Sequence, residues 1–273
     1  MIDLRIDPAW TAEILERFLR IETQRAGRAR VVVGLSGGID SAVAASLAAR
    51  ALGPTQVVCL ALPHRLSSPA SLADARSVAE QLGAPFETVD ITPIVDGFLQ
   101  VVGDPGRLRL GNAMARARMM CLFDRSAALD ALVLGTSNKT ELLLGYGTLH
   151  GDLASAINPL GDLYKTQVRA LAEHLAIPEA VQRKPPSADL WPNQTDEEDL
   201  GVRYADVDRL LWLLIDARAG DATAVAAGFA PERVAWVRAR VASMQFKRVP
   251  PVVAKVSGRA PGRDFRYPRG GSS

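Results

Sequence analysis

One short segment carries the residues best suited to chemistry, and it reads GLSGGIDS over residues 34–41. An apolar run, RVVV, precedes it and an alanine-rich run follows, so a strand is expected to end and a helix to begin there. At a helix N-terminus several backbone N–H groups lack intrahelical partners and attract anions, and glycines let an anion come close. Ser36 and Ser41 add hydroxyl donors. The segment predicts a phosphate-binding loop, although glycine pairs alone would also suit a plain tight turn.

Asp40 indicates that a metal ion accompanies the phosphates. A carboxylate repels phosphate unless a cation lies between them, and Mg²⁺ usually binds through one or two carboxylates together with phosphate oxygens. The segment lacks the Gly-Lys-Ser/Thr of a Walker A loop, and no G-x-G-x-x-G follows the first expected strand. The sequence thus predicts a nucleotide polyphosphate bound with Mg²⁺. Another segment must supply the positive charge that the loop lacks.

Four short apolar runs alternate with helical patterns in the first half of the chain. Being rich in Val and Leu, they are typical of strands buried on both faces of a parallel sheet, and they cover about residues 30–36, 56–63, 86–91 and 130–137. Helices are expected near 10–22, 39–52, 71–82, 93–101 and 112–129, and later near 165–175, 207–217 and 231–243. This alternation predicts an α/β fold with a doubly wound, Rossmann-like parallel sheet and additional C-terminal helices.

Composition sets outer limits on the protein. Its 273 residues are 48% apolar and 23% charged, which is enough to build a sizeable core. A formal charge of +2 gives no general attraction to nucleic acid or membranes. No apolar run approaches membrane-spanning length, and the first residues do not resemble a signal peptide. We therefore expect a soluble, cytoplasmic protein.

Two polar segments lie in the second half. The stretch RKPPSADLWPNQTDEEDLG is too long for a simple connector and suits a lid or binding loop, with a surface excursion as the alternative. We expect one catalytic domain over residues 1–245 and a basic tail over residues 246–273 that folds onto it. The tail carries seven lysines and arginines against the single acid Asp264. It could cover an anionic ligand or be merely solvated.

Motifs along nearly the whole chain resemble those of one family. The segment 34–41 resembles the S-G-G-x-D-S pyrophosphate loop of the N-type ATP pyrophosphatases. The later motifs are GNAMARARM, LGTSNKTELLLGY, PLGDLYKTQVRALA and KPPSADLWPNQTDEEDLG, and with them the chain is similar to the ammonia-dependent NAD synthetases. The resemblance implies the adenine nucleotide alpha hydrolase type of fold and a homodimer. It also implies adenylation of the nicotinate carboxylate of deamido-NAD by ATP, release of pyrophosphate, and formation of NAD with ammonia.

The resemblance further assigns roles to single residues. ATP contacts would come from Gly34, Leu35, Ser36, Gly37, Gly38, Ile39, Asp40 and Ser41, and from Thr136, Lys165 and Ser187. Asp40 and Glu141 would hold Mg²⁺, and Lys165 would bring the missing positive charge. Arg116, Asp152 and Lys247 would contact the deamido-NAD acceptor. No Ser-His-Asp or Cys-His constellation is visible, so no covalent nucleophile is expected.

Four positions depart from the family's usual pattern, and all of them belong to the acceptor side. Gly147 replaces an aromatic residue, Leu149 a lysine, Ala156 an aspartate and Phe246 a histidine. Two other hypotheses therefore stay open beside an NAD synthetase. One is an ATP pyrophosphatase that acts on another carboxylate or carbonyl, and the other is a homologue that binds ATP without catalysis.

Overall fold

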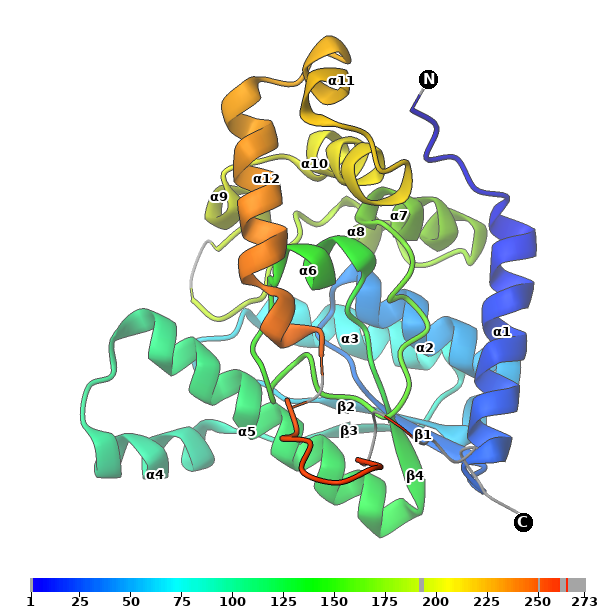
Figure 1. Cartoon of the computed structure of the whole chain (residues 1–273). Helices are drawn as coiled ribbons and strands as arrows, with labels where there is room; N and C mark the ends of the chain where they lie inside the picture. The colour runs from blue at the N-terminus through cyan, green and yellow to red at the C-terminus, as the bar shows by residue number, and fades with distance from the viewer. Residues whose placement is uncertain (1, 192–193, 250, 261–263, 265–273) are drawn as a thin grey trace.

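A parallel four-stranded sheet forms the centre of the computed structural model, which describes residues 2–191, 194–249, 251–260 and 264. The strands are β1 (Arg30–Gly34), β2 (Val57–Ala61), β3 (Phe86–Thr88) and β4 (Ala131–Leu134), in the order β3-β2-β1-β4 (Figure 1). Their alternation with helices confirms the predicted doubly wound α/β fold. The chain moves from β1 to one side of the sheet and returns with β4 on the other. Ligands of such sheets bind where the strand order reverses, beyond the carboxyl end of β1.

Helices cover both faces of the sheet. On one face lie α1 (Pro8–Arg25), α2 (Ile39–Leu52), α3 (Pro69–Leu82) and α7 (Lys165–His174); on the other lie α4 (Thr92–Val102) and α5 (Gly106–Leu129). Val31 and Val33 of β1 belong to the core between the sheet and α1, α2, α3 and α7. Val32 belongs to the core on the opposite face, beneath α4 and α5. The valine run is therefore buried on both faces, as its composition predicted.

The alanine-rich part of α2 lies between the sheet and α1. Residues 42–49 of this helix are all buried, and five of these eight residues are alanines. Such small side chains let two neighbouring layers approach α2 closely. The N-terminus of α2, and with it the glycine-serine loop, is thereby fixed at the edge of the sheet.

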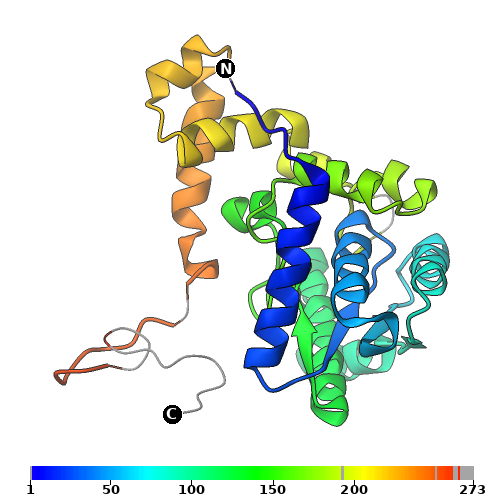
Figure 2. The same ribbon diagram turned by 90° about the vertical axis from the view of Figure 1, so that its right-hand side faces the viewer.

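The C-terminal helices form a second layer with its own core (Figure 2). They are α9 (Asp196–Leu200), α10 (Tyr204–Leu211), α11 (Asp221–Ala226) and α12 (Pro231–Ser243), and they pack with α6 (Lys139–Leu144). The short helix α8 (Glu179–Arg183) packs instead against α2 and α7, and its Val181 belongs to the core on that face of the sheet. The helix expected near 207–217 begins at Tyr204 and becomes a π-helical turn over Trp212–Asp216. The helix expected at 112 begins earlier, at Gly106. In the described part of the chain, no helix is long and apolar enough to cross a membrane.

The expected tail begins as part of this second layer. A short 3₁₀ turn over Gln245–Lys247 follows α12. Lys247 donates to the carbonyl oxygens of Gly145 and Gly147, at 2.7 and 2.6 Å, and Arg248 donates to that of Leu143 at 2.8 Å. These cations satisfy carbonyl groups at the C-terminal end of α6. The basic residues at 263, 266 and 269 lie outside the described residues.

Candidate active site

A cavity of about 1220 Å³ opens beyond the carboxyl ends of β1, β2 and β4. It extends from the loop after β1 to the segment between α8 and α9 and to the end of α12. Two of the fifteen predicted site residues, Gly37 and Arg116, do not line it. The other thirteen do: Gly34, Leu35, Ser36, Gly38, Ile39, Asp40, Ser41, Thr136, Glu141, Asp152, Lys165, Ser187 and Lys247. Segments far apart in the sequence thus meet at the point where the strand order reverses.

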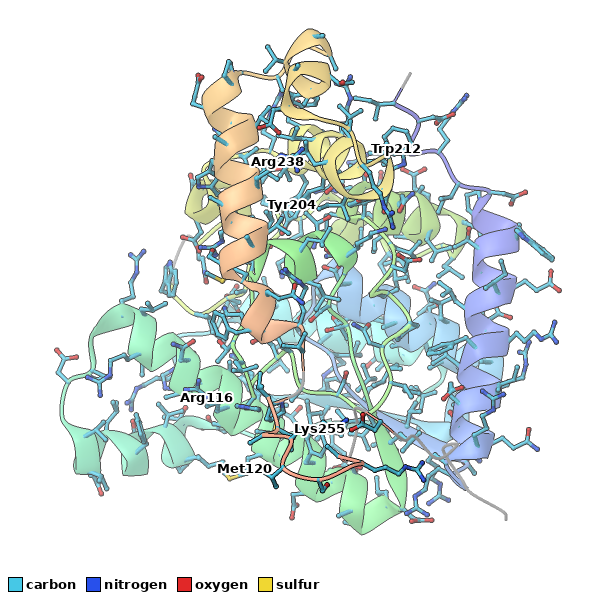
Figure 3. The ribbon with its side chains drawn as sticks, in the orientation of Figure 1. Arg116, Met120, Tyr204, Trp212, Arg238 and Lys255 are labelled. Atoms are coloured by element: carbon cyan, nitrogen blue, oxygen red, sulfur yellow. The ribbon has the colours of Figure 1, made fainter. Side chains whose placement is uncertain are left out.

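Arg116 lies outside this group. It is exposed on α5, on the same helix as Met120, and its Nε lies 3.3 Å from the carbonyl oxygen of Leu149 (Figure 3). Arg118 lines the cavity instead, since two steps along a helix turn a side chain by about 200°. Its guanidinium donates to the carbonyl oxygen of Leu62 at 3.0 Å. No sequence signal distinguished these two arginines, because the helix orientation decides which one faces inward.

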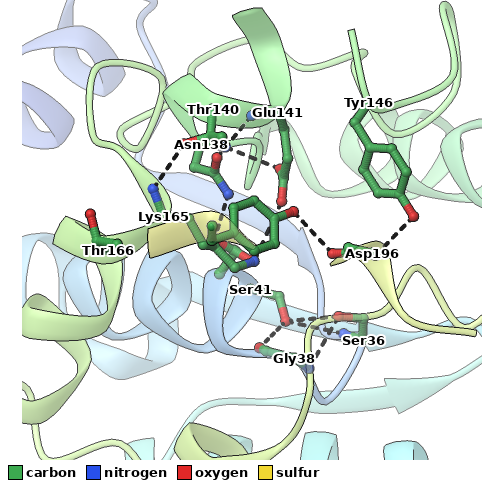
Figure 4. Close-up of polar contacts among 12 residues, drawn as sticks. Ser36, Gly38, Ser41, Asn138, Thr140, Glu141, Tyr146, Lys165, Thr166 and Asp196 are labelled. Atoms are coloured by element: carbon green, nitrogen blue, oxygen red, sulfur yellow. Dashed lines mark hydrogen bonds and ion pairs between the residues drawn. The ribbon is translucent and has the colours of Figure 1, made fainter. Parts of the chain in front are cut away.

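The loop after β1 is held in shape by its own hydroxyl groups (Figure 4). Ser41 Oγ donates to the carbonyl oxygen of Gly38 at 2.9 Å and accepts from the N–H of Ser36 at 3.2 Å. Ser36 Oγ accepts from the N–H of Gly38 at 3.2 Å. Gly37 has φ +74°, in the left-handed region that favours glycine. The two serines therefore brace a turn that opens the N-terminus of α2 toward the cavity.

Two carboxylates meet beside this turn and share one cation. Lys165 Nζ forms ion pairs with Asp40 Oδ2 and with Glu141 Oε1, the latter at 3.4 Å. The lysine side chain is only 2% exposed, while those of Asp40 and Glu141 are 17% and 15% exposed. The ammonium lies deeper than either carboxylate. Together the three residues form a buried ion cluster at the edge of the cavity.

Asn138 joins the two carboxylates from the other side (Figure 4). Its Nδ2 donates to Asp40 Oδ1 at 3.0 Å, and its backbone N–H donates to Glu141 Oε2 at 3.2 Å. Its Oδ1 also accepts from the N–H of Glu141 at 3.0 Å, which completes a capping box at the start of α6. Asn138 was not among the residues predicted from the sequence, although the spacing N-x-x-E in SNKTE is the signature of such a cap.

Burial and mutual charge shift the titration of this cluster. Burial raises the pKa of Glu141, and the neighbouring Asp40 carboxylate adds to the rise, whereas Lys165 opposes it. Burial also disfavours the charged form of Lys165, but Asp40 and Glu141 outweigh it and raise the pKa of the ammonium. The two carboxylates can therefore be ionised together only while a cation compensates them.

A further carboxylate fixes the two segments that carry Glu141 and Lys165. Asp208 on α10 accepts from Thr140 Oγ1 at 2.6 Å and from the N–H of Thr166 at 2.8 Å. The side chain of Asp208 is fully buried. Since these threonines are the direct neighbours of Glu141 and Lys165, Asp208 ties α6 and α7 together behind the ion cluster.

The polar segment between α8 and α9 lines another side of the cavity. Lys184 Nζ lies 2.9 Å from Asp74 Oδ2 on α3. The N–H of Ser68, just before α3, donates to Asp189 Oδ2 at 3.1 Å, and the N–H of Asp189 donates to Ser187 Oγ at 3.0 Å. The segment is thus fastened to α3 and has the position expected of a binding loop.

The turn after α6 lines the part of the cavity where the acceptor is expected to bind. Gly147 is the one departure position among the described residues that line the cavity. A Cβ on Gly147 would lie 2.6 Å from Leu153 Cδ2 and 2.9 Å from Asp152 Oδ2. The space beside position 147 is therefore already filled by Leu153. Asp152 accepts from the N–H of Thr148 at 2.7 Å, which closes the turn.

The donor set is suited to magnesium. Within the described residues, no group of three or more His, Cys, Asp and Glu side chains is placed to hold a metal. Asp40 and Glu141 supply hard oxygen ligands, and both face one positively charged group, Lys165 Nζ. Mg²⁺ commonly binds through one or two carboxylates and takes its other ligands from phosphates and water. The pair is thus adequate for a magnesium ion that binds with a nucleotide.

The fold is the Rossmann-like fold of the adenine nucleotide alpha hydrolases, shared with solved NAD synthetases. The chain belongs to the NAD synthase family, whose profile matches residues 11–251. It is 54% identical over 269 residues to the NH(3)-dependent NAD(+) synthetase of Trichlorobacter lovleyi. The match covers 98% of each of the two chains. The enzyme of the same name from Fusobacterium nucleatum is 43% identical over 89% of this chain and 94% of its own.

Two solved structures extend the comparison. The NH3-dependent NAD synthetase from Campylobacter jejuni, in complex with the nitrate ion, superposes with a TM-score of 0.78 at 34% identity. It covers 92% of this chain and 100% of its own. An NMN synthetase from Francisella tularensis gives a TM-score of 0.82 at 31% identity, over 92% of this chain and 99% of its own.

Proposed function

We propose that this chain is an ammonia-dependent NAD synthetase. In the proposed reaction ATP adenylates the nicotinate carboxylate of deamido-NAD, pyrophosphate leaves, and ammonia displaces AMP to give NAD. The observation that carries the proposal is the placement of the Asp40–Glu141 pair beside the loop 34–41 in one large cavity. The relatives named NH(3)-dependent NAD(+) synthetase support this substrate set.

Magnesium is part of the proposal. Asp40 and Glu141 would hold the ion, which would neutralise the phosphates of ATP during the transfer. Asn138 keeps both carboxylates in place through its hydrogen bonds to Asp40 Oδ1 and Glu141 Oε2. The protein thereby provides a preformed pair of ligands, which reduces the reorganisation needed when the nucleotide binds.

The chain's own groups account for positioning and charge. The N-terminus of α2 and the serine-braced loop would receive the departing pyrophosphate, with Lys165 as the nearest buried cation. Thr136 and Ser187 line the same cavity and would contact the nucleotide. A carboxylate oxygen of the acceptor attacks the α-phosphorus, and the bond from that phosphorus to the β-phosphate oxygen breaks. Ammonia then attacks the carboxyl carbon, and AMP leaves with the carboxylate oxygen.

The acceptor would lie toward the end of α12. Asp152 and Lys247 line that part of the cavity, and Lys247 holds the turn at Gly145 and Gly147. Each is proposed to position deamido-NAD, Asp152 by accepting and Lys247 by donating hydrogen bonds.

A homodimer is also proposed. Several large apolar side chains are exposed on α4 and α5, namely Phe98, Val101, Leu108, Met120 and Phe123. Arg116 is exposed on α5 one turn before Met120. Exposed apolar clusters of this kind are typical of subunit interfaces. In a dimer Arg116 would lie at the interface, from which it could reach an acceptor bound at the edge of the cavity.

One assay tests the proposed function. The purified chain is incubated with ATP, MgCl₂, NH₄Cl and deamido-NAD, and NAD and pyrophosphate are measured together. We expect both products in equal amounts and none from the Asp40→Asn variant. Nicotinate mononucleotide serves as the comparison acceptor, because one solved relative is called an NMN synthetase. If the folded wild-type protein forms neither product with deamido-NAD, the proposal is wrong.

A further inference from the structure

The two carboxylates proposed to bind magnesium already hold a cation, and that cation belongs to the protein. Lys165 Nζ pairs with Asp40 Oδ2 and Glu141 Oε1. Its side chain enters from α7, is 2% exposed, and lies 5.2 Å from the centre of the Tyr204 ring. The ammonium therefore occupies the position between the carboxylates that a metal ion would need.

Asn138 and Lys165 bind different oxygens of the two carboxylates. Asn138 binds one oxygen of each carboxylate, Asp40 Oδ1 through Nδ2 and Glu141 Oε2 through the backbone N–H. Lys165 binds the other oxygen of each. The carboxylates are thus fixed from one side independently of the lysine. If the ammonium moved, Asp40 and Glu141 would still present Oδ2 and Oε1 to a common point.

We infer that Lys165 blocks the metal site until the nucleotide binds. A divalent ion cannot share Asp40 Oδ2 and Glu141 Oε1 with an ammonium without strong repulsion. The ammonium cannot leave alone either, because two buried carboxylates would then lack a counter-charge. Binding of ATP with magnesium removes both obstacles. The phosphates would pair with the ammonium of Lys165, and magnesium would take its place between the two carboxylates. Lys165 is thus a positioning residue that couples metal binding to nucleotide binding.

The geometry of the lysine makes this exchange feasible. The ammonium of Lys165 has three N–H donors and is attached to a flexible four-carbon chain. Lys165 and the phosphate-loop residues Ser36, Gly38 and Ser41 line the same cavity. The backbone of Lys165 stays fixed, because its N–H donates to Thr140 Oγ1 at 3.1 Å. Only the side chain must turn from the carboxylates toward the phosphates. The inference rests on the proposed function, because that function supplies the nucleotide.

The test measures metal binding without nucleotide. Mn²⁺ binding is followed by electron paramagnetic resonance in the wild type, Lys165→Met and Lys165→Arg. We expect Lys165→Met to bind Mn²⁺ at least about tenfold more tightly than the wild type, since a unit charge within about 4 Å exerts a larger effect than that. Lys165→Arg keeps the charge and should match the wild type. A folded Lys165→Met protein that binds Mn²⁺ no more tightly overturns the inference.

A second measurement uses the wild-type protein and does not depend on Lys165→Met folding. The ¹⁵N resonance of the Lys165 ammonium is assigned by its absence from Lys165→Arg. We expect Mg²⁺ alone to leave it unchanged, and Mg²⁺ with a non-hydrolysable ATP analogue to shift it. A shift of the same size with Mg²⁺ alone would show that the ammonium does not block the site.

The outcomes separate the inference from the proposed function. NAD formation by the wild type together with unchanged Mn²⁺ binding by Lys165→Met supports the function and rejects the block. Tighter Mn²⁺ binding by Lys165→Met without NAD formation by the wild type supports the block and rejects the acceptor.

Discussion

The carbonyl oxygen of Ser71, at the start of α3, lies against the position that a Cβ on Gly37 would occupy. The two residues come from different segments, and their contact closes the phosphate loop against the next βα unit. Gly37 also has φ +74°. Glycine is therefore required here for two reasons, the backbone conformation and the lack of space.

Gly37→Ala should displace the loop. The left-handed conformation alone costs an L-residue roughly 1–2 kcal/mol, and the contact with Ser71 must move as well. We expect ATP affinity to fall at least about tenfold, or about 1.4 kcal/mol, as measured by calorimetry with a non-hydrolysable analogue. Gly27→Ala is the matched control, because Gly27 has φ +66° but open space around it. Equal ATP affinities for the two variants would contradict this account of the loop.

Asn138→Ser separates two functions of one side chain. Serine can still cap α6, but it cannot replace the Nδ2 donor that lies 3.0 Å from Asp40 Oδ1. We expect the magnesium concentration for half-maximal activity to rise several-fold, and the unfolding free energy to fall by about 1–3 kcal/mol because Asp40 Oδ1 loses a donor. Asn138→Ala removes the cap as well and should cost about 1 kcal/mol more in stability. An unchanged magnesium requirement in both variants would exclude a role for Asn138 in metal binding.

Gly147 and Leu153 should behave as a coupled pair. Gly147→Ala places a Cβ 2.6 Å from Leu153 Cδ2, so the turn must shift and the KM for deamido-NAD should rise several-fold with little change for ATP. Adding Leu153→Ala removes the clash. Residues in contact show interaction energies of about 0.5–3 kcal/mol, and the double variant should therefore bind the acceptor better than the single effects predict. Steady-state kinetics of the four proteins measures this, and additive effects would argue against direct packing.

Asp208 should make folding stability depend on pH. Burial raises the pKa of this carboxyl, although hydrogen bonds from Thr140 and Thr166 partly oppose the rise. The folded protein therefore holds the proton more tightly than the unfolded chain, whose aspartates titrate near about 3.9. Stability from this group is fully present below the unfolded pKa and is lost as the pH rises through the folded pKa.

Asp208→Asn removes that titration. The quantity to follow is the unfolding free energy of the wild type minus that of Asp208→Asn, measured by urea unfolding at several pH values. This difference should fall as the pH rises from acid toward neutrality. Because asparagine can accept only one hydrogen bond well at this position, the variant should also lose about 1–3 kcal/mol near pH 4, where the unfolded carboxyl begins to titrate. A relative stability that increases with pH would reverse the sign and contradict the account.

Local patterns were sufficient to predict the strands and the glycine-serine loop. The apolar composition of the valine run at residues 31–33 and of the alanine run after Ser41 predicts that both are buried, and both are buried in the structure. The short helices α6, α8, α9 and α11 were not predicted, because five or six residues show no clear helical period. Tertiary packing onto α10 and α12 stabilises α6 instead.

Motifs predicted which segments contribute side chains to the cavity, but they did not predict the contacts between those side chains. Asp40, Glu141 and Lys165 meet as expected, but their sequence separation gave no indication that the lysine binds the carboxylates rather than facing open solvent. The links through Asn138 and Asp208 also depend on contacts between distant segments. For Arg116 and Arg118, only the orientation of α5 determines which side chain faces the cavity.

The most direct test of the central claim follows the carboxylate oxygen of the acceptor. Deamido-NAD labelled with ¹⁸O in its nicotinate carboxylate is incubated with the protein, ATP, Mg²⁺ and ammonia, and AMP is examined by mass spectrometry. Attack of the carboxylate on the α-phosphorus predicts AMP that carries a single ¹⁸O atom, formed in equal amount with NAD. NAD formation with unlabelled AMP, or label in inorganic phosphate instead, would contradict adenylation of the carboxylate.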